Sequence, residues 1–336
     1  MYRLWFTALI AVYTAVALVP SYTRAAVKIH ILAGSPPNPP TGTFNDEVCT
    51  QAQADTIRAG ITDAKNMANV AINVLKPTDM NKSNGFYWLF GGSTVSAAFV
   101  SKRFAFVNNL GTPDTITSTA PFQNSATDLI FTCIPASAPK SEEAYANTLN
   151  IGKKTTSGVV SNLNLIRFSP SGLANTESFV TAAARIRASG NIASAFPMIN
   201  AKPSPPLAFT LVHEVQHSNP LLDNPETDHF IDQKDFDNKR AYGFNQIQAK
   251  LDANLKRLNP QNYAFFGLLA QSNPEYFLPN CYIGNPLGSA GTSSSAVGHL
   301  ASGTCTANST VCAACERIIK GIPSDINLAH FDDDTQ

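Results

Sequence analysis

Two histidines flank a glutamate in the segment with the clearest chemical potential, His213-Glu214-Val215-Gln216-His217. Residues four apart lie on one face of a helix, so the two imidazoles can converge on one metal ion. Glu214 directly follows the first histidine, where its carboxylate can take a proton from a water molecule on that ion. This H-E-x-x-H spacing predicts a Zn²⁺ site for hydrolysis, with His213 and His217 as ligands and Glu214 as general base.

The surrounding residues predict a helix. An apolar run precedes the pentad, and Ser204-Pro205-Pro206 is typical of a helix start. Asn219-Pro220 predicts the helix end, one turn after the pentad. The alternative is an amphipathic helix with the three polar side chains on a solvated face. We favour the metal site, because the segment is strongly apolar and two of only six histidines have ligand spacing.

The first residues are typical of a secretory signal peptide, which we place at residues 1–26. Arg3 precedes an apolar stretch from Leu4 to Val19, and Thr23-Arg24-Ala25 resembles a cleavage site. A membrane anchor is the alternative, but the stretch is short for a span and ends at Pro20. No later segment is long and apolar enough to cross a membrane. We therefore expect a secreted, extracellular and soluble protein, with no membrane contact after cleavage.

Charge and cysteine content narrow the function classes. The chain has 24 basic and 24 acidic residues, and removal of Arg3 and Arg24 would leave a net charge of −2. Without a basic block, neither nucleic acid nor an anionic membrane is an expected partner. Six cysteines in an exported chain favour disulfides, with no pairing selected by the sequence. A second zinc site at Cys305, Cys312 and Cys315 is the alternative.

Hydrophobic periodicity predicts an α+β fold. We divide the mature chain into a metallopeptidase-like domain at 27–280 and a Cys/Ser/Gly-rich C-terminal extension at 281–336. The β-rich runs are short, whereas the segments with apolar residues at three- and four-residue steps are longer. Strands are expected at Val27–Leu32 and among β-rich runs in 95–168, including Asp128–Cys133 and Leu163–Phe168. Helices are expected at Asp46–Leu75, Thr176–Ala188, Ala241–Leu258 and Asn262–Ala270, besides the helix that carries the pentad.

Two segments downstream of the pentad carry a family resemblance. Tyr242-Gly243 and the stretch Asn259–Phe266 follow the pentad at spacings that resemble the deuterolysin-type fungal metallopeptidases, or aspzincins, which include lysine-specific members. The resemblance covers about residues 44–270. It implies a zincin-like fold, with a mixed N-terminal lobe and a helical C-terminal lobe around the H-E-x-x-H helix. It also implies zinc on His213 and His217, Glu214 as general base, and Tyr242 as a donor to the oxyanion.

The third metal ligand is where this sequence departs from the family. The family's aspartate lies three residues before the tyrosine, a position taken here by Lys239, which cannot ligate while charged. The segment from Phe230 to Tyr242 instead predicts a hairpin that turns at Asp237-Asn238.

In such a two-residue hairpin, residue 232 lies opposite residue 243, beside Tyr242. We therefore predict Asp232 as the third ligand, with Asp237 as the alternative, although a turn position suits Asp237 structurally. Asp235 would point to the other face of its strand, and His229 is a remoter choice.

The resemblance also bears on substrate. Lysine-specific members hold the lysine side chain with acidic residues, and the matching positions here are Gln261 and Ala264. We expect a secreted zinc endopeptidase, a monomer acting on proteins or peptides with a broader preference. The alternative is a catalytically impaired, secreted zinc-binding or interaction protein that retains the fold. A third hypothesis makes the pentad accidental in a disulfide-stapled structural protein.

Overall fold

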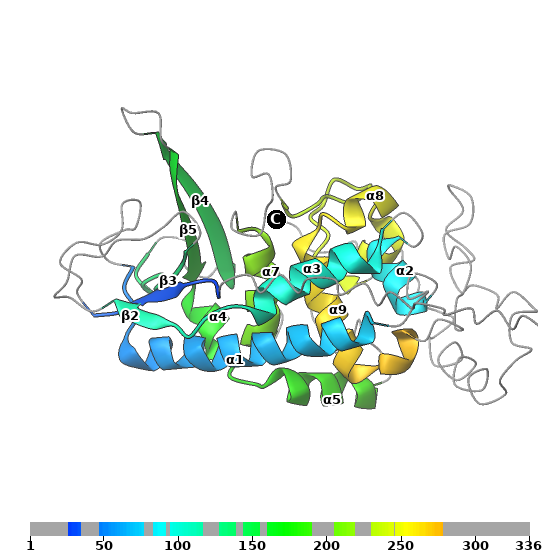
Figure 1. The fold of residues 1–336 in the computed structure, drawn as a ribbon, viewed down its shortest axis with the longest axis horizontal. Coiled ribbons are helices and arrows are strands. Elements are labelled where there is room, and N and C mark those ends of the chain that lie inside the picture. Colours follow the sequence, from blue (N-terminus) through cyan, green and yellow to red (C-terminus); the bar gives the residue numbers. More distant parts are fainter. Residues whose placement is uncertain are drawn as a thin grey trace, which may run out of the picture.

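A computed structural model describes the chain at residues 26–34, 47–76, 83–91, 95–116, 128–138, 144–154, 160–189, 205–218, 230–244 and 246–277 (Figure 1). The predicted signal peptide, His229 and the C-terminal extension with its four cysteines lie outside the described residues. Within the described ranges, no helix combines the length and apolarity needed to cross a bilayer.

A five-stranded sheet forms one side of the molecule (Figure 1). Its order is β2-β1-β3-β5-β4, and all neighbours are parallel except β4, which runs antiparallel to β5 at the edge. The predicted mixed α+β class is confirmed. The strands are β1 (Ile29–Leu32), β2 (Asp114–Ile116), β3 (Leu129–Cys133), β4 (Ala146–Lys154) and β5 (Val160–Phe168).

Helices form the rest of the molecule and one continuous apolar core with a face of the sheet (Figure 1). The long helix α1 starts with a capping box, in which Thr50 and Gln53 each accept a hydrogen bond from the other's backbone N–H. The α-helices are α1 (Gln51–Val74), α2 (Asn84–Phe90), α3 (Ala97–Asn108), α4 (Pro170–Ala174), α5 (Phe179–Ser189), α7 (Leu207–Gln216), α8 (Ala253–Lys256) and α9 (Pro260–Ser272).

Helix α7 lies at the centre of this arrangement, between α1, α9 and β4. All ten of its residues are buried, which explains the uniformly apolar sequence before the pentad. Gly60 of α1 permits a close approach, because a Cβ added there would lie 2.5 Å from Leu207 Cδ2. The two helices therefore pack with little side chain between them.

Two predicted elements are wrong. The region 95–168 was expected to carry β-rich runs, yet its first part, Ala97–Asn108, forms α3, whose start is capped by the Ser96 hydroxyl. The helix expected over Ala241–Leu258 is broken into a π-helical turn, η3 (Gln246–Lys250), and the short α8. A final 3₁₀ turn, η4 (Pro274–Phe277), follows α9.

One disulfide is confirmed, and it joins Cys49 to Cys133. It connects the residue two before α1 to the last residue of β3, across 84 positions of sequence. Both cysteines are buried in the core. The bond thus links the start of the longest helix to the middle of the sheet.

A buried lysine connects three of the short helical elements. Lys256 Nζ donates to the carbonyl oxygens of Trp88 at 2.8 Å and Gln248 at 3.0 Å, so α8 holds both α2 and η3. Burial lowers the pKa of Lys256 from 10.5 to about 7. Between these values the unfolded chain binds a proton that the folded chain does not, so stability must rise with pH across this window.

We expect Lys256→Met to flatten that rise. Wild-type unfolding free energy should increase between about pH 7.5 and about pH 9.5 by up to about 1.4 kcal/mol per pH unit from this group. Urea unfolding at several pH values measures the slope. Lys234→Met, at an exposed hairpin position, is the matched control and should keep the wild-type slope; equal slopes in all three proteins would contradict the assignment.

Candidate metal centre

The pentad straddles the end of α7. The helix ends at Gln216, and His217 is its C-cap, still in the right-handed region with φ −76° and ψ −15°. The predicted helix end at Asn219-Pro220 is therefore wrong, because the helix stops before the last histidine. At its start Pro206 is the N-cap without a side-chain hydrogen bond, and Ser204 lies outside the described residues. The retained backbone geometry keeps His217 on the same face as His213.

Side chains from two other elements and from the residue after the C-cap bind the last carbonyl groups of α7. Arg103 of α3 donates to the backbone oxygen of Gln216 at 2.8 Å and to its side-chain oxygen at 2.9 Å. Asn150 of β4 donates to the oxygen of His217 at 2.8 Å, and Ser218 Oγ to that of Val215 at 2.6 Å. The bonds from Arg103 and Asn150 give partners to carbonyls beyond the last backbone bonds of the helix, and Ser218 Oγ adds to the backbone bond that Ser218 N–H makes to Val215 at 3.1 Å.

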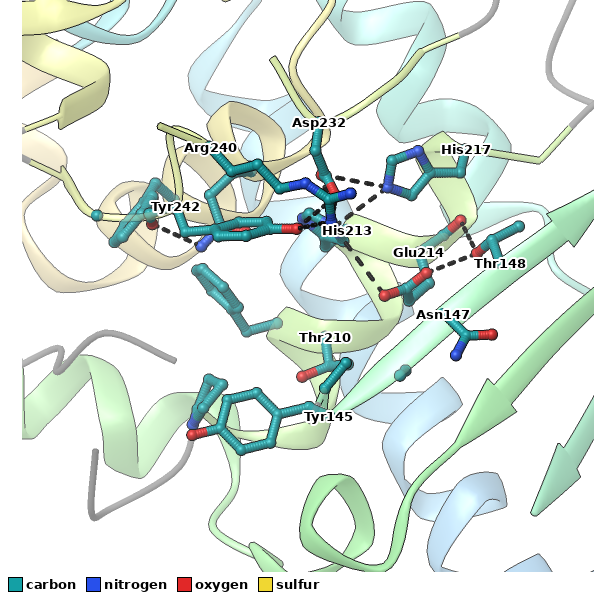
Figure 2. Close-up of a pocket in the computed structure, with 17 residues that line it drawn as sticks. Tyr145, Asn147, Thr148, Thr210, His213, Glu214, His217, Asp232, Arg240 and Tyr242 are labelled. Carbon is teal, nitrogen blue, oxygen red and sulfur yellow. Dashed lines mark hydrogen bonds and ion pairs between the residues drawn. The ribbon is translucent and has the colours of Figure 1, made fainter. Parts of the chain in front are cut away.

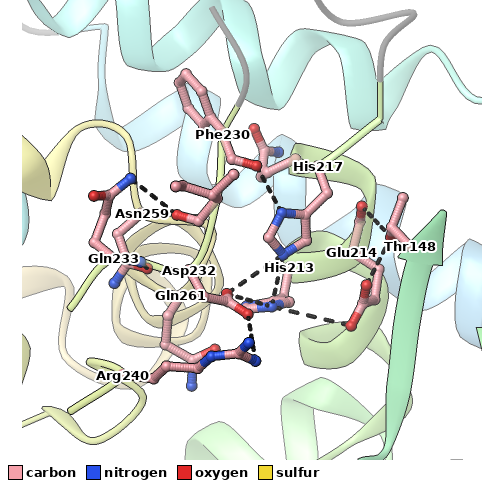
Figure 3. A network of polar contacts seen from close by, with 12 residues as sticks. Thr148, His213, Glu214, His217, Phe230, Asp232, Gln233, Arg240, Asn259 and Gln261 are labelled. Carbon is pink, nitrogen blue, oxygen red and sulfur yellow. Dashed lines mark hydrogen bonds and ion pairs between the residues drawn. The ribbon is translucent and has the colours of Figure 1, made fainter. Parts of the chain in front are cut away.

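Three possible ligand atoms form a nearly equilateral triangle (Figure 3). The Nε2 atoms of His213 and His217 are 3.2 Å apart, and Asp232 Oδ1 lies 3.2 Å from the first and 3.4 Å from the second. Ligands on a tetrahedral ion with bonds of about 2.0–2.1 Å lie about 3.3 Å from one another. His213, His217 and Asp232 can therefore hold a metal ion.

Hydrogen bonds and charges prepare these atoms as ligands. His217 Nδ1 donates to the backbone oxygen of Phe230 at 2.7 Å, which leaves Nε2 with its lone pair for a metal. Oδ1 of Asp232 is buried without a hydrogen-bond partner in the described part of the chain. A buried carboxylate oxygen without a hydrogen bond is costly unless positive charge lies beside it, and a cation among these three atoms would supply that charge.

The pKa shifts reflect the same convergence of charge. Burial would lower the pKa of His213, but the nearby carboxylates of Asp232 and Glu214 outweigh it and raise that pKa. Burial would raise the pKa of Asp232, but the two imidazoles hold it well below its usual range. The protein surroundings thus favour a negative Asp232 beside positive charge, as a cation site requires.

The hairpin places Asp232 at the histidines, with a register one residue from the predicted one. Lys234 pairs with Arg240, so residue 232 faces Tyr242 itself rather than residue 243. The difference arises at the tip, where Asn238 adopts a left-handed conformation with φ 63°. Tyr242 Oη donates to Asp232 Oδ2 at 2.6 Å, which confirms the predicted proximity of these two residues.

The other candidates on this hairpin lie elsewhere. Asp237, the alternative ligand, is exposed and accepts a hydrogen bond from Lys250 at 2.8 Å, away from the histidines. Asp235 accepts from the backbone N–H groups of Asp237 and Lys239 and so stabilises the turn. Lys239 is exposed at the tip. Asp237 is therefore corrected from possible ligand to turn residue.

Glu214 lies beside the triangle and is held by the edge strand. Its Oε1 lies 4.0 Å from His213 Nε2, and its side chain is almost fully buried. The Thr148 hydroxyl lies 2.6 Å from Glu214 Oε2 and 2.9 Å from its backbone oxygen. Figure 2 shows Thr148 reaching Glu214 from β4. One hydroxyl proton serves one oxygen at a time, and when it points to Oε2 it orients the Glu214 side chain.

Tyr242 completes the polar side of the site. Arg240 Nη1 donates to Tyr242 Oη at 3.0 Å, while Tyr242 donates to Asp232. Burial, followed by the charge of Asp232, raises the pKa of Tyr242. The phenol therefore stays protonated in the neutral range and keeps a hydrogen to donate.

All these groups open into one pocket of about 270 Å³ (Figure 2). Gln261 lines this pocket and donates to the backbone oxygen of Tyr242 at 2.8 Å, whereas Ala264 is buried in the core. Neither position supplies the acidic group that a lysine pocket needs. The remaining lining is mainly apolar or uncharged and includes Tyr145, Pro205, Phe209, Thr210 and Phe265.

Several functional neighbours were not predicted. Arg103 and Gln216 are 113 positions apart, and no local pattern connects them. Thr148 lies on a strand that the sequence did not single out. Arg240 had a usable signal, because side chains two apart on a strand share a face and Tyr242 was already a candidate.

The chain was also compared with known proteins. No family model matches it, and neither the curated proteins nor the solved structures gave a significant match. A function for this chain therefore has to be inferred from the geometry and chemistry of its site.

We expect Asp232→Asn to weaken Zn²⁺ binding more than about 100-fold, because it removes a charged ligand from a buried site. Asp237→Asn makes the same chemical change on the same hairpin and should bind Zn²⁺ within about twofold of wild type. Competition with a chromophoric chelator measures both. Equal affinities for the two variants would contradict the assignment of Asp232.

Proposed function

We propose that this protein is a secreted zinc endopeptidase of the deuterolysin (aspzincin) type. The observation that carries the proposal is the Glu214 carboxylate beside a three-ligand triangle, in one open pocket with Tyr242. A structural metal site is normally closed by four protein ligands, whereas a catalytic site keeps a position open. The described residues offer three protein ligands, with the Glu214 carboxylate next to them as the general base.

The donor set suits zinc. Two imidazole nitrogens and one carboxylate oxygen are ligands that Zn²⁺ accepts, and the spacing of the three atoms fits its tetrahedral preference. Zinc bound there would polarise a peptide carbonyl and lower the pKa of a coordinated water towards about 7.

Glu214 would transfer the proton in both halves of the reaction. Its carboxylate takes a proton from the attacking water as the new C–O bond forms, and then gives it to the leaving nitrogen as the C–N bond breaks. Thr148 would hold the carboxylate in place throughout, because its hydroxyl already contacts Glu214 Oε2. No other carboxylate lines the pocket among the described residues except Asp232.

Tyr242 would donate to the negative oxygen that develops on the attacked carbonyl. Its hydroxyl now donates to Asp232 and would have to turn towards the substrate as charge develops there. The raised pKa favours this role, since an ionised phenol could not donate.

Edge strand β4 offers a way to bind an extended peptide. Its residues Ala146, Asn147 and Thr148 line the pocket, and within the described chain β4 pairs only with β5. An unpaired strand edge can bind a peptide backbone as an added strand. A peptide bound in this way would pass the Glu214 carboxylate, which suits cleavage within a chain.

The resemblance to the aspzincins and the disulfide add to the proposal. Asp232 meets Tyr242 from across a hairpin although the local Asp-x-x-Tyr spacing is lost. The Cys49–Cys133 bond favours an oxidising compartment, as export through the predicted signal peptide would provide.

Glu214→Gln should lower kcat/KM by about 10²–10⁴-fold on susceptible peptides, because the amide cannot accept the proton. Zinc content should be unchanged, as Glu214 is not among the three ligands. Cleavage of a mixed peptide library, followed by mass spectrometry, compares the variant with zinc-loaded wild type. Undiminished cleavage by the variant would refute the mechanism. No cleavage by either protein, with zinc bound, would favour the zinc-binding, non-catalytic alternative.

Tyr242→Phe should lower kcat by about 10–10³-fold at saturating zinc while KM changes little, because the hydroxyl acts mainly in the transition state. Steady-state kinetics on one cleavable peptide provides the measurement. Zinc titration of the variant is needed alongside, since Tyr242 also donates to Asp232. A change in KM alone would place Tyr242 in substrate binding instead.

A further inference from the structure

Arg240 places a positive charge in the wall of the pocket that the proposed peptidase mechanism does not use. Its side chain is 63% exposed, and Figure 2 shows its guanidinium reaching over the Tyr242 hydroxyl towards the metal-binding triangle. Among the described residues that line the pocket, Arg240 is the one lysine or arginine. Any charged substrate group beside the cleaved bond would therefore meet it.

The guanidinium keeps free hydrogen-bonding capacity. Nη1 donates to Tyr242 Oη at 3.0 Å and lies 3.7 Å from Asp232 Oδ2, too far for a second hydrogen bond. No further hydrogen bond of Arg240 occurs within the described ranges. Nε and Nη2 thus remain available, and arginine N–H groups match the two oxygens of a carboxylate.

The charge balance of the loaded site also favours an anion. A divalent ion and Arg240 together carry three positive charges against the two carboxylates of Asp232 and Glu214, so the loaded site would have one net positive charge. Gln261 lines the pocket with an uncharged amide, and Glu214 and Asp232 are the only carboxylates among the described lining residues. A basic side chain would therefore be repelled and a carboxylate attracted.

We propose that Arg240 is a specificity residue that binds a substrate carboxylate next to the cleaved bond. This inference rests on the proposed peptidase function. The carboxylate can come from an acidic side chain or from the C-terminus of a short peptide, and both present the same two oxygens. The pocket would thus select against the lysine side chain that related lysine-specific enzymes bind.

The test uses zinc-loaded full-length protein and amidated peptides that differ only in Glu, Gln or Lys beside the cleaved bond. We expect wild type to prefer Glu over Gln by about three- to tenfold in kcat/KM, and Gln over Lys, with both ratios smaller at high salt. Arg240→Gln should remove the Glu preference, Arg240→Glu should reverse the order, and Arg240→Lys should keep part of it.

A second set of peptides identifies the source of the carboxylate. The Gln peptide, ending shortly after the cleaved bond, is offered with a free C-terminus and with an amide. A preference for the free acid that disappears in Arg240→Gln assigns the terminal carboxylate; a preference seen only with Glu assigns the side chain. Either result supports the proposal, and no preference in both sets overturns it.

Two controls separate Arg240 from other causes. Lys234→Glu makes the same charge change on the paired residue of the hairpin, outside the pocket lining, and should retain most of the wild-type preference. If Lys234→Glu changed the Glu preference as much as Arg240→Glu does, the proposal would be overturned, because the overall charge of the hairpin would then account for the preference. Arg240→Gln lowering all peptides equally would also overturn it, because Arg240 would then act only through Tyr242.

Binding measurements distinguish failure of this proposal from failure of the peptidase function. Fluorescence anisotropy with zinc-loaded Glu214→Gln protein reports peptide affinity without turnover. The order Glu, Gln, Lys in affinity, with no cleavage by wild type, would support Arg240 as a carboxylate binder and refute the peptidase. Cleavage by wild type with no charge preference in either assay would support the peptidase function and refute Arg240 as a carboxylate binder.

Discussion

The position at which α7 ends is the constraint on which the site depends. Ending a buried helix leaves carbonyl groups that cost about 1–3 kcal/mol each if they find no partner. Arg103 and Asn150 supply those partners at Gln216 and His217, and Ser218 Oγ adds a second bond at Val215, which also accepts from the Ser218 N–H. Because these side chains come from α3, β4 and the chain after α7, the helix end fixes the relation of three parts of the fold. Arg103 also stacks 3.6 Å above the Phe230 ring, and the Phe230 backbone oxygen orients His217.

The centre of the site concentrates charge that the surrounding core cannot solvate. Asp232, Glu214 and two imidazoles lie together beneath an apolar wall that includes Phe209 and Phe265. A buried cluster of charges is stable only when each charge lies beside an opposite charge and its polar atoms are hydrogen-bonded. The contacts of Thr148 and Tyr242 are therefore part of the same electrostatic balance as the ligands, and each holds one carboxylate oxygen while leaving the other for the centre.

The sequence predicted those features that local chemistry determines. The pentad spacing, the long helix that α1 fulfils, and the closeness of Asp232 to Tyr242 all follow from periodicity or turn chemistry. The hairpin register was one residue off, because a left-handed Asn238 lengthens the turn in a way that Asp-Asn alone does not specify. Helix α3 was missed because Phe99, Val100 and Phe104 suit a strand equally well, and only burial decides between the two. Contacts such as Arg103–Gln216 depend on tertiary packing and have no local signature.

Asp232 and Tyr242 form a rung across the hairpin, ten positions apart in the chain. Their geometry is set by the paired strands, whereas residues 236–239 at the tip are exposed. Residues could be added to or removed from that tip, in steps that preserve pairing, with the ligand and its hydrogen-bond donor left in place. In sites of this kind, the number of residues between two cooperating side chains can change while the two side chains stay opposite each other. A sequence motif with a fixed interval will therefore overlook proteins that share the same chemistry.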